Sequence, residues 1–264
     1  MPRAKRRLGQ HFLTDPRILA RIADAVEATP DDTVLEIGPG RGGLTAALAE
    51  RAGRVVAIEK DPDLVPELRA QYPGVTVVEG DALESDWHAL AGRRFLVVGN
   101  IPYNITSPLI DKALEPPRPG RIVFLVQQEV ADRIVARPST SEYGALTVGV
   151  QAVARAERLF AVPAGAFHPR PKVDSAVLRL TPLENPLVSG EQQRAFRRLV
   201  VGLFGFRRKQ LLRGLRELTG WEALRVEAVL AAVGVAPELR PEALAPESFA
   251  GLLRALVDGG WRAT

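Results

Sequence analysis

Short apolar runs alternate with amphipathic segments between residue 33 and about residue 181. The runs are rich in Val, Ile and Leu and apolar on both faces, which is typical of strands in a parallel sheet covered by helices. Strands are expected at 33–37, 54–59, 75–79, 95–99, 121–126, 158–162 and 175–180. Helices are expected at 43–52, 61–71, 105–114, 127–137 and 144–155. The alternation predicts an α/β fold with a mostly parallel, Rossmann-like sheet and helices on both faces.

The pattern changes near the end of the last strand. The final two expected strands have no clear helix between them, so we expect a hairpin at one edge of the sheet. A turn-rich break follows at 181–190, and beyond it the pattern is helical, with breaks near Gly205, Gly220, Gly234–Pro237 and Pro246. We therefore predict a catalytic domain over 1–184 and a small all-α domain over 185–264.

Composition excludes several kinds of chemistry. The chain has no cysteine, which excludes disulfides, thiolate metal sites and cysteine nucleophiles. Its three histidines are far apart in the sequence, so no metal site is expected. No apolar run approaches the roughly 18–20 residues that span a bilayer. We expect a soluble cytoplasmic protein, a monomer with no membrane association.

Positive charge is concentrated in two segments, although the net charge is only +4. The basic N-terminal segment 1–21 has six Lys or Arg residues and one acid, and the basic segment 194–216 has eight and no acid. The remainder is acidic. Two acid-poor clusters in one chain favour a polyanionic partner such as RNA.

A glycine-rich loop follows the first expected strand. Glu36 precedes four glycines, at positions 38, 40, 42 and 43. Gly38, Gly40 and Gly43 satisfy a dinucleotide-binding pattern. Glu36 with Gly38, Gly40 and Gly42 satisfies the acid-x-G-x-G-x-G pattern of S-adenosylmethionine (AdoMet) methyltransferases. Glycines let the backbone turn tightly and approach a ligand. Glu59, at the end of the second strand, does not decide between the two, since either cofactor has a ribose diol.

Two carboxylates favour AdoMet. Glu36 would repel a pyrophosphate but attract the sulfonium and ammonium of AdoMet. Asp81, in the Gly-Asp-Ala turn after the third strand, is suited to accept a hydrogen bond from the adenine amine. A nicotinamide-dependent oxidoreductase is the alternative, but it leaves the basic segments unexplained.

The segment after the fourth strand indicates the reaction. It reads Asn100-Ile101-Pro102-Tyr103 and would face the same crevice as the glycine loop. The Asn100 oxygen and the carbonyl of Ile101 or Pro102 would accept both hydrogens of an aromatic amine, which directs its lone pair at a methyl donor. Pro102 stiffens the segment, and Tyr103 offers a ring on which a base can stack.

Such a target base must be single-stranded or flipped out of its helix. Phe167 lies in a proline-rich stretch between the last two strands, where we expect an exposed loop. Its ring is the candidate for a second stacking surface opposite Tyr103.

These motifs together resemble the KsgA-type small-subunit (16S) ribosomal RNA adenine N6,N6-dimethyltransferases. The resemblance extends from about Lys5 into the C-terminal helices and includes the order Gln10–Leu13, Glu36–Gly42, Gly80–Ala82, Asn100–Ile105 and Phe167–Ser175. It implies transfer of four methyl groups from AdoMet to two adjacent adenosines in a hairpin loop near the 3′ end of the RNA. It also implies a role late in small-subunit assembly.

The motifs and the resemblance together give the candidate site residues. The cofactor residues are His11, Leu13, Glu36, Gly38, Gly40, Glu59, Lys60, Asp81, Ala82 and Asn100. The catalytic and base-binding residues are Asn100, Pro102, Tyr103 and Phe167, and the RNA-binding residues are Arg6, Arg7, Arg207, Arg208 and Lys209. The chain departs from the family at His11, where Asn is frequent, and after Lys209, where the usual polar residues are missing.

Two further alternatives stay open at this point. The related large-subunit rRNA adenine methyltransferases share the glycine loop and the Asn-x-Pro-Tyr segment. A ribosome assembly factor that acts mainly by binding immature small subunits is the other alternative.

Overall fold

The computed structural model describes residue 5 and residues 9–262, which form two compact units. The first unit runs to Ala131 and includes Ala156–Pro182, and the second contains Asp132–Arg155 and Leu183 onward. The second unit thus includes a segment, Asp132–Arg155, that the sequence analysis assigned to the first domain. The break at Pro182 lies close to the predicted boundary.

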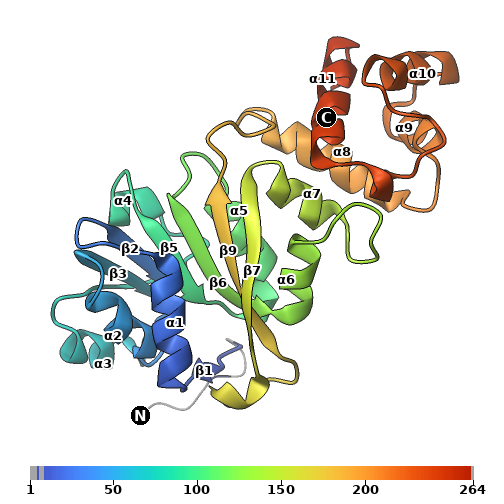
Figure 1. Cartoon of the computed structure of the whole chain (residues 1–264). Helices are drawn as coiled ribbons and strands as arrows, with labels where there is room; N and C mark the ends of the chain where they lie inside the picture. Colours follow the sequence, from blue (N-terminus) through green and yellow to red (C-terminus); the bar gives the residue numbers. More distant parts are fainter. Residues whose placement is uncertain (1–4, 6–8, 263–264) are drawn as a thin grey trace. The chain divides into compact units, whose positions relative to one another are not determined.

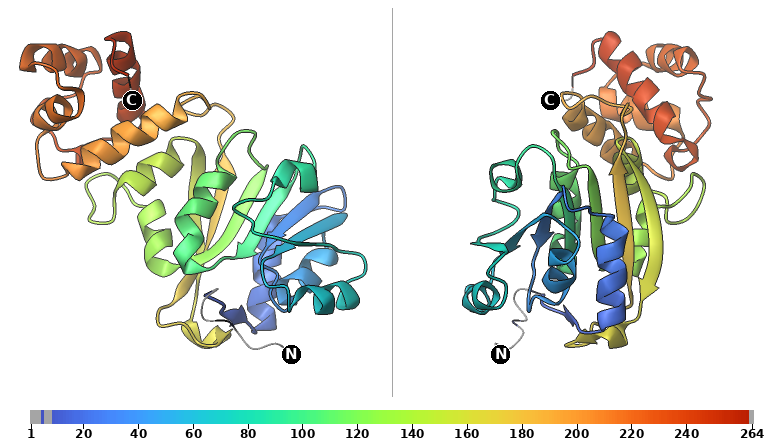
Figure 2. Two further views of the ribbon diagram at one scale, coloured as in Figure 1. Left: turned by 180° about the vertical axis from the view of Figure 1, so that it is seen from behind. Right: turned by 60° about the vertical axis from the view of Figure 1, so that its left-hand side comes forward.

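A seven-stranded sheet forms the centre of the first unit, with helices on both faces (Figure 1 and Figure 2). Its strand order is β4-β3-β2-β5-β6-β9-β7. The strands are β2 (Thr33–Ile37), β3 (Arg54–Glu59), β4 (Thr76–Glu79), β5 (Leu96–Asn100), β6 (Arg121–Gln127), β7 (Ala154–Val162) and β9 (Ser175–Pro182). The first five run parallel to one another, and β9 runs antiparallel to β6. The predicted α/β class is confirmed.

The helices of this unit connect and cover the strands. They are α1 (Pro16–Val26), α2 (Gly43–Ala49), α3 (Val65–Gln71), α4 (Trp87–Ala91), η2 (Tyr103–Ile105), α5 (Thr106–Ala113), α6 (Gln128–Ile134), which continues into the second unit, and η3 (Ala164–Ala166). A small separate sheet pairs β1 (Phe12–Leu13) with β8 (Phe167–His168). The core lies between the sheet and these helices, where Val34, Leu48 and Val98 are fully buried.

Helix α1 was not predicted, although its start is marked in the sequence. The Asp15 carboxylate accepts hydrogen bonds from the backbone N–H groups of Arg17 and Ile18 at 2.9 and 3.3 Å, and Pro16 occupies the first helical position. The helix ends at Glu27, which has a left-handed φ of 51°.

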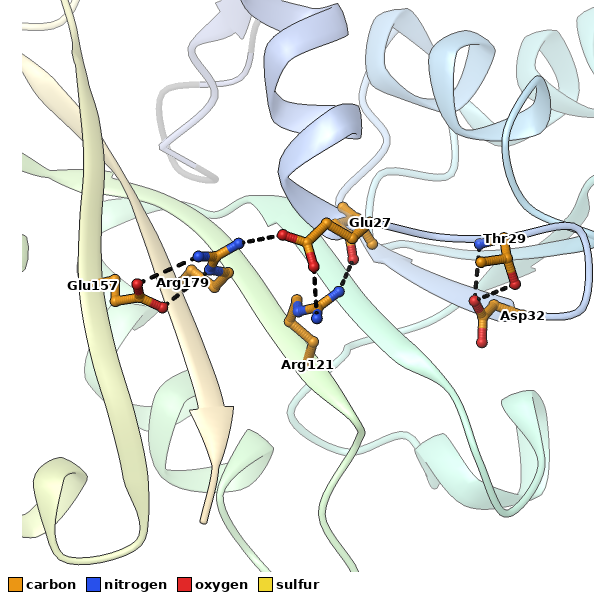
Figure 3. A network of polar contacts seen from close by, with 7 residues as sticks. Glu27, Thr29, Asp32, Arg121, Glu157 and Arg179 are labelled. Atoms are coloured by element: carbon orange, nitrogen blue, oxygen red, sulfur yellow. Dashed lines mark hydrogen bonds and ion pairs between the residues drawn. The ribbon is translucent and has the colours of Figure 1, made fainter. Parts of the chain in front are cut away.

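An ion-pair network joins the end of α1 to the sheet (Figure 3). The Glu27 carboxylate contacts Arg121 on β6 at 2.8 Å and Arg179 on β9 at 2.6 Å. Arg179 also pairs with Glu157 on β7 at 3.2 Å, and Arg121 donates to the Val26 carbonyl at 2.7 Å. Nearby, the backbone N–H and hydroxyl of Thr29 both donate to Asp32. The network fixes the helix that directly follows β1.

The second unit is helical. It contains α7 (Ala145–Gln151), α8 (Gln193–Gly205), α9 (Leu211–Thr219), α10 (Ala223–Ala232), η4 (Pro241–Ala243) and α11 (Pro246–Asp258). The rings of Tyr143, Phe204 and Phe249 pack in sequence, with centroids 6.1 and 5.8 Å apart. The buried Tyr143 hydroxyl donates to the Leu244 carbonyl at 2.7 Å.

Within the described residues, no helix is long and apolar enough to cross a membrane.

The Arg179 contacts generate a stability prediction. Replacement of Arg179 by Met should lower the free energy of unfolding by about 1–3 kcal/mol, because the partly exposed carboxylates of Glu27 and Glu157 lose charged hydrogen bonds. Urea unfolding would measure this loss. The control is Arg93→Met, which changes an exposed arginine. Equal losses in the two variants would contradict a stabilising role for the network.

Candidate active site

The main pocket opens where the strand order reverses. The chain proceeds from β2 outward to β4 and then returns to β5, so β2 and β5 are neighbours whose carboxyl ends meet. Ile37 and Gly99 are paired in this register, which places the glycine loop beside Asn100. Open α/β sheets bind ligands at this position.

Twelve of the predicted residues line this pocket. They are His11, Leu13, Glu36, Gly38, Gly40, Glu59, Lys60, Asp81, Ala82, Asn100, Pro102 and Tyr103. They come from the N-terminal segment and from the ends of β2, β3, β4 and β5. The fold therefore brings together residues that are spread over more than ninety positions of the sequence.

The glycine loop needs its glycines for different reasons. Gly38, Gly40 and Gly42 all have left-handed φ values, of 67°, 60° and 79°. A Cβ at Gly40 would lie 3.0 Å from the Phe12 ring, and one at Gly42 would lie 2.3 Å from the Tyr72 ring. A Cβ at Gly38 would meet only the Asn100 carbonyl, at 3.9 Å, so Gly38 is the place where the loop is open to a ligand.

Glu36 is a buried carboxyl at the base of this loop. It is 1% exposed, and the Thr45 hydroxyl donates to it at 2.6 Å. Burial raises the pKa of Glu36 to about 8, and the nearby Glu59 charge adds to the rise. The neutral form therefore predominates at pH 7, and a cation bound in the pocket would favour the ionised form.

Glu59 holds the loop in place. Its carboxylate accepts from the Gly40 N–H at 3.0 Å and from the Asp61 N–H at 2.8 Å. Burial raises its pKa. Together Glu36 and Glu59 make the pocket suitable for the positive charge of AdoMet and unsuitable for a pyrophosphate.

Asp81 is an ionised acceptor at the pocket edge. The Lys60 ammonium contacts it at 2.5 Å, and the Leu83 N–H donates to it at 2.9 Å. The Lys60 hydrogen bond holds the pKa of Asp81 below its usual range. Since each carboxylate oxygen accepts more than one hydrogen bond, these contacts are compatible with the predicted bond to an adenine amine.

The Asn100 amide has a defined orientation. Its Nδ2 donates to the backbone carbonyl of His11 at 2.8 Å. A carbonyl only accepts, so the amide must present its NH2 group to His11, and Oδ1 is directed away from it. Asn100 is thereby held as a hydrogen-bond acceptor for a group in the pocket.

The structure also bears on the second acceptor, which the sequence left open between Ile101 and Pro102. The Pro102 carbonyl already accepts from the Ile105 N–H at 3.1 Å and from the Thr106 hydroxyl at 3.3 Å. These contacts favour the Ile101 carbonyl for the role.

Tyr103 is braced by residues that sequence reasoning did not assign to this task. Its hydroxyl is 2.7 Å from the Ser175 hydroxyl. Its ring stacks near the His11 ring, with centroids 5.9 Å apart and planes 25° from parallel. His11 Nδ1 in turn lies 2.8 Å from the Pro169 carbonyl and must be its donor. Ser175 and Pro169 both belong to the quoted motif 167–175, but the sequence did not indicate these contacts.

The N-terminal wall of the pocket has its own anchor. Asp61 is fully buried, and its carboxylate accepts from the Lys5 ammonium at 2.5 Å and from the Gln10 amide at 3.0 Å. Lys5 and Gln10 lower the pKa of Asp61 against the effect of burial. Asp61 was not predicted as a site residue, although it directly follows Glu59 and Lys60.

The expected exposed loop at Phe167 is wrong, and its stacking role stays a prediction. Phe167 lies outside the pocket lining, in β8, where it pairs with Leu13 and is 5% exposed. The prolines nearby indicated an exposed loop, but β1 and the apolar core cover the ring. The flat side chain that the structure places beside Tyr103 is His11.

The predicted RNA-binding residues also differ from one another. Arg207 pairs with Glu242 at 2.5 Å and donates to the backbone carbonyls of Thr140 and Ser141. Lys209 lies 3.6 Å from Glu217, whereas Arg208 is exposed. Arg207 thus has a structural role within its unit. Arg6 and Arg7 lie outside the described residues.

Within the same described part of the chain, no cluster of three or more His, Cys, Asp or Glu side chains is arranged to hold a metal ion.

The raised pKa of Glu36 predicts how the stability of the fold changes with pH. A carboxyl with an ordinary pKa of 4.5 when unfolded and about 8 when folded stabilises the fold fully below pH 4.5 and loses that contribution as pH rises to 8. The loss amounts to about 1.4 kcal/mol per unit of pKa difference. Urea unfolding at pH 5 and pH 8 should therefore show a smaller decrease for Glu36→Gln than for the wild type. An identical decrease would contradict the raised pKa.

Comparisons with known proteins identify the family of this chain. Residues 1–255 match the family described as ribosomal RNA adenine dimethylase. A ribosomal RNA small subunit methyltransferase A from Geobacter metallireducens is 44% identical, with 97% of this chain and 96% of the relative covered.

Two solved structures extend the comparison. A dimethyladenosine transferase from Plasmodium falciparum has a TM-score of 0.86 at 27% identity, covering 95% of this chain and 99% of that one. The 23S rRNA methyltransferase ErmE has a TM-score of 0.73 at 34% identity, covering 93% and 99%. With the pocket geometry and the near-complete match in view, the chain belongs to the ribosomal RNA adenine dimethylase family.

Proposed function

We propose that this chain transfers methyl groups from AdoMet to the N6 atoms of two adjacent adenosines near the 3′ end of small-subunit ribosomal RNA. The product is N6,N6-dimethyladenosine. The observation that carries this proposal is the oriented Asn100 amide beside the glycine loop, with its oxygen available as an acceptor. We further propose that it acts as a monomer in the cytoplasm on immature small subunits.

The residues of the chain divide the task of binding the donor. Glu36 and Glu59 place carboxyl groups around the open face of Gly38, where a bound cation favours their ionised forms, and Asp81 is the acceptor for the adenine amine. Bound AdoMet supplies a methyl group on a positively charged sulfur. His11 and Leu13 close the pocket from the N-terminal side.

Asn100 and Ile101 act on the target nitrogen. The lone pair of an adenine N6 is delocalised into the ring, which makes the amine a poor nucleophile. Acceptors at Asn100 Oδ1 and the Ile101 carbonyl bind its two hydrogens and favour a pyramidal nitrogen. Such positioned dipoles act in a pocket from which water is displaced, where they have their greatest effect. Pro102 restricts the backbone between the acceptors and Tyr103.

A large-subunit substrate is the second candidate, and ErmE is the observation that raises it. The identity to ErmE is 34%, compared with 44% to the small subunit methyltransferase A from Geobacter metallireducens. The TM-score is also lower, at 0.73 compared with 0.86 for the dimethyladenosine transferase. The comparison of identities favours the small-subunit substrate, and the comparison of TM-scores favours an adenosine dimethyltransferase.

Methyl transfer to isolated subunits tests the proposal. Radiolabelled AdoMet should label undermethylated small subunits, and nucleoside analysis should identify dimethyladenosine. Large subunits prepared in the same way serve as the control. Labelling of large subunits alone, or of neither, would contradict the proposal.

Substitution of Tyr103 distinguishes a role in base stacking from a role in AdoMet binding. Tyr103→Ala should raise the KM for RNA by about 5- to 150-fold, because a stacking ring contributes about 1–3 kcal/mol per base. Tyr103→Phe is the matched control, since it keeps the ring and removes only the contact with Ser175. If Tyr103→Ala abolished AdoMet binding instead, the ring would belong to the donor site.

A further inference from the structure

Asp61 is a fully buried carboxylate to which the chemistry described so far gives no part. It lies just after the end of β3 and is 0% exposed, and it is outside the lining of the pocket. Burial of a carboxylate is unfavourable unless hydrogen bonds satisfy its oxygens. Asp61 receives such bonds from the N-terminal segment, through Lys5 and Gln10. The position of that segment therefore depends on a charge buried at the end of the sheet.

The donors and acceptors of this contact are arranged in one order. Asp61 Oδ1 accepts from the Lys5 ammonium at 2.5 Å and from the Asp63 N–H at 3.2 Å. Asp61 Oδ2 accepts from Gln10 Nε2 at 3.0 Å, and Gln10 Oε1 accepts from the Lys5 backbone N–H at 2.8 Å. Reversal of the Gln10 amide would bring its NH2 group against the Lys5 N–H, so its direction is fixed. We call the hydrogen bond between the Gln10 and Asp61 side chains the Gln10–Asp61 clasp.

The clasp lies directly before the residue that orients the Asn100 amide. Gln10 precedes His11, whose backbone carbonyl accepts from Asn100 Nδ2 at 2.8 Å. After His11 the segment continues into β1, where Phe12 and Leu13 pair with β8. The His11 carbonyl therefore lies between two anchors, the clasp before it and the β1–β8 pair after it.

Asp61 is also connected to the glycine loop. Its backbone N–H donates to Glu59 Oε1 at 2.8 Å, and Glu59 Oε2 accepts from the Gly40 N–H at 3.0 Å. One residue thus contacts both the carboxylate that supports the glycine loop and, through its side chain, the segment that orients Asn100. The two halves of the pocket, for the donor and for the target nitrogen, meet at this residue.

We propose that Asp61 is a positioning residue for methyl transfer. Through Gln10 it fixes the His11 carbonyl, and that carbonyl sets the direction of the Asn100 amide oxygen. The inference rests on the proposed function, since the nitrogen on which Asn100 acts is the adenosine N6. Because Asp61 lies outside the pocket lining, its effect on the reaction passes through the N-terminal segment. Loss of the clasp should therefore slow the transfer step without weakening the binding of small subunits.

Reversal of the polarity of the clasp tests the proposal. In Asp61→Asn, the amide oxygen stays with the Lys5 ammonium, so the new NH2 group faces the NH2 group of Gln10. In Gln10→Glu, a new carboxylate oxygen faces Asp61 Oδ2. In the double variant Gln10→Glu/Asp61→Asn, the new amide donates to the new carboxylate, which also accepts from the Lys5 N–H. The clasp then forms again with the opposite polarity and the same total charge.

The readout is the single-turnover rate of methylation at saturating small subunits. Each single variant should be slower by about tenfold or more, the loss expected when a hydrogen bond to a charged group is broken. The subunit concentration that gives half the maximal rate should stay at the wild-type value. The double variant should recover the wild-type rate to within about a few-fold, because the two sites are in contact and their effects are coupled. Asp63→Asn is the matched control, since it removes an equal charge from an exposed side chain that also contacts Lys5, at 2.5 Å.

Hydrogen exchange provides a second readout that does not depend on methylation. In both single variants the peptide that contains β1 should exchange faster by a similar factor, while the peptide that contains β2 should exchange as in the wild type. The double variant and Asp63→Asn should match the wild type in both peptides. Faster exchange in β2 as well would show a general loss of stability and would contradict a positioning role.

The outcomes separate the inference from the proposed function. Losses that multiply in the double variant, or unchanged rates and exchange in both single variants, would overturn the inference while wild-type methylation upheld the proposed function. Failure of the wild type to methylate small subunits would refute the proposed function, and hydrogen exchange would still measure whether the clasp holds the segment. Gln10→Met leaves Asp61 in place and removes the amide. It should also be slower by about tenfold, and a wild-type rate for it would overturn the inference even if Asp61→Asn did not fold.

Discussion

The hydrogen bond from the Asn100 amide to the His11 carbonyl is the contact on which the site depends. It joins the carboxyl end of β5 to the N-terminal segment. It also fixes which end of the amide carries the NH2 group, so that Oδ1 is an acceptor with a defined direction. The other supports of the site converge on the same two segments. Asp61 anchors the N-terminal segment through Gln10, and the Ser175 hydroxyl holds the Tyr103 hydroxyl, close in sequence to Asn100.

A second constraint is the burial of carboxyl groups around the glycine loop. Glu36, Glu59 and Asp61 are all at most 5% exposed, yet only Asp61 has a cationic partner among the hydrogen bonds described above, the Lys5 ammonium. Burial of the other two raises their pKa values and disfavours their charged forms. The fold thus retains an unfavourable arrangement that a positively charged ligand would relieve. This is the electrostatic reason why the pocket suits a sulfonium donor.

Much of the architecture could be predicted because its signals are local. Runs that are apolar on both faces identified the strands, and the glycines and prolines identified the breaks between the C-terminal helices. The glycine loop and the Asn100–Tyr103 segment could be placed together because carboxyl ends of parallel strands share one edge. Helix α1 was missed even though Asp15 and Pro16 mark its start, since the strand pattern begins only after it.

What could not be predicted depends on residues distant in sequence. Phe167 reads as part of an exposed loop until its pairing with Leu13, more than 150 positions earlier, is known. The ion pair of Arg207 with Glu242 could not be predicted from the basic run. The stack of His11 on Tyr103 likewise exists only in the folded chain. Charge and aromatic content therefore identified the kind of ligand, while the particular side chains facing it required the tertiary structure.

Single-turnover methylation by Asn100→Asp, beside Asn100→Ala, tests the role of the amide most directly. Aspartate keeps an oxygen acceptor but cannot donate to the His11 carbonyl, so it loses the fixed orientation and gains repulsion. Both variants should react about 10²- to 10³-fold more slowly than the wild type, the loss typical of one transition-state hydrogen bond. A wild-type rate for Asn100→Asp would show that an acceptor suffices without the amide's donated bond, and would contradict the account.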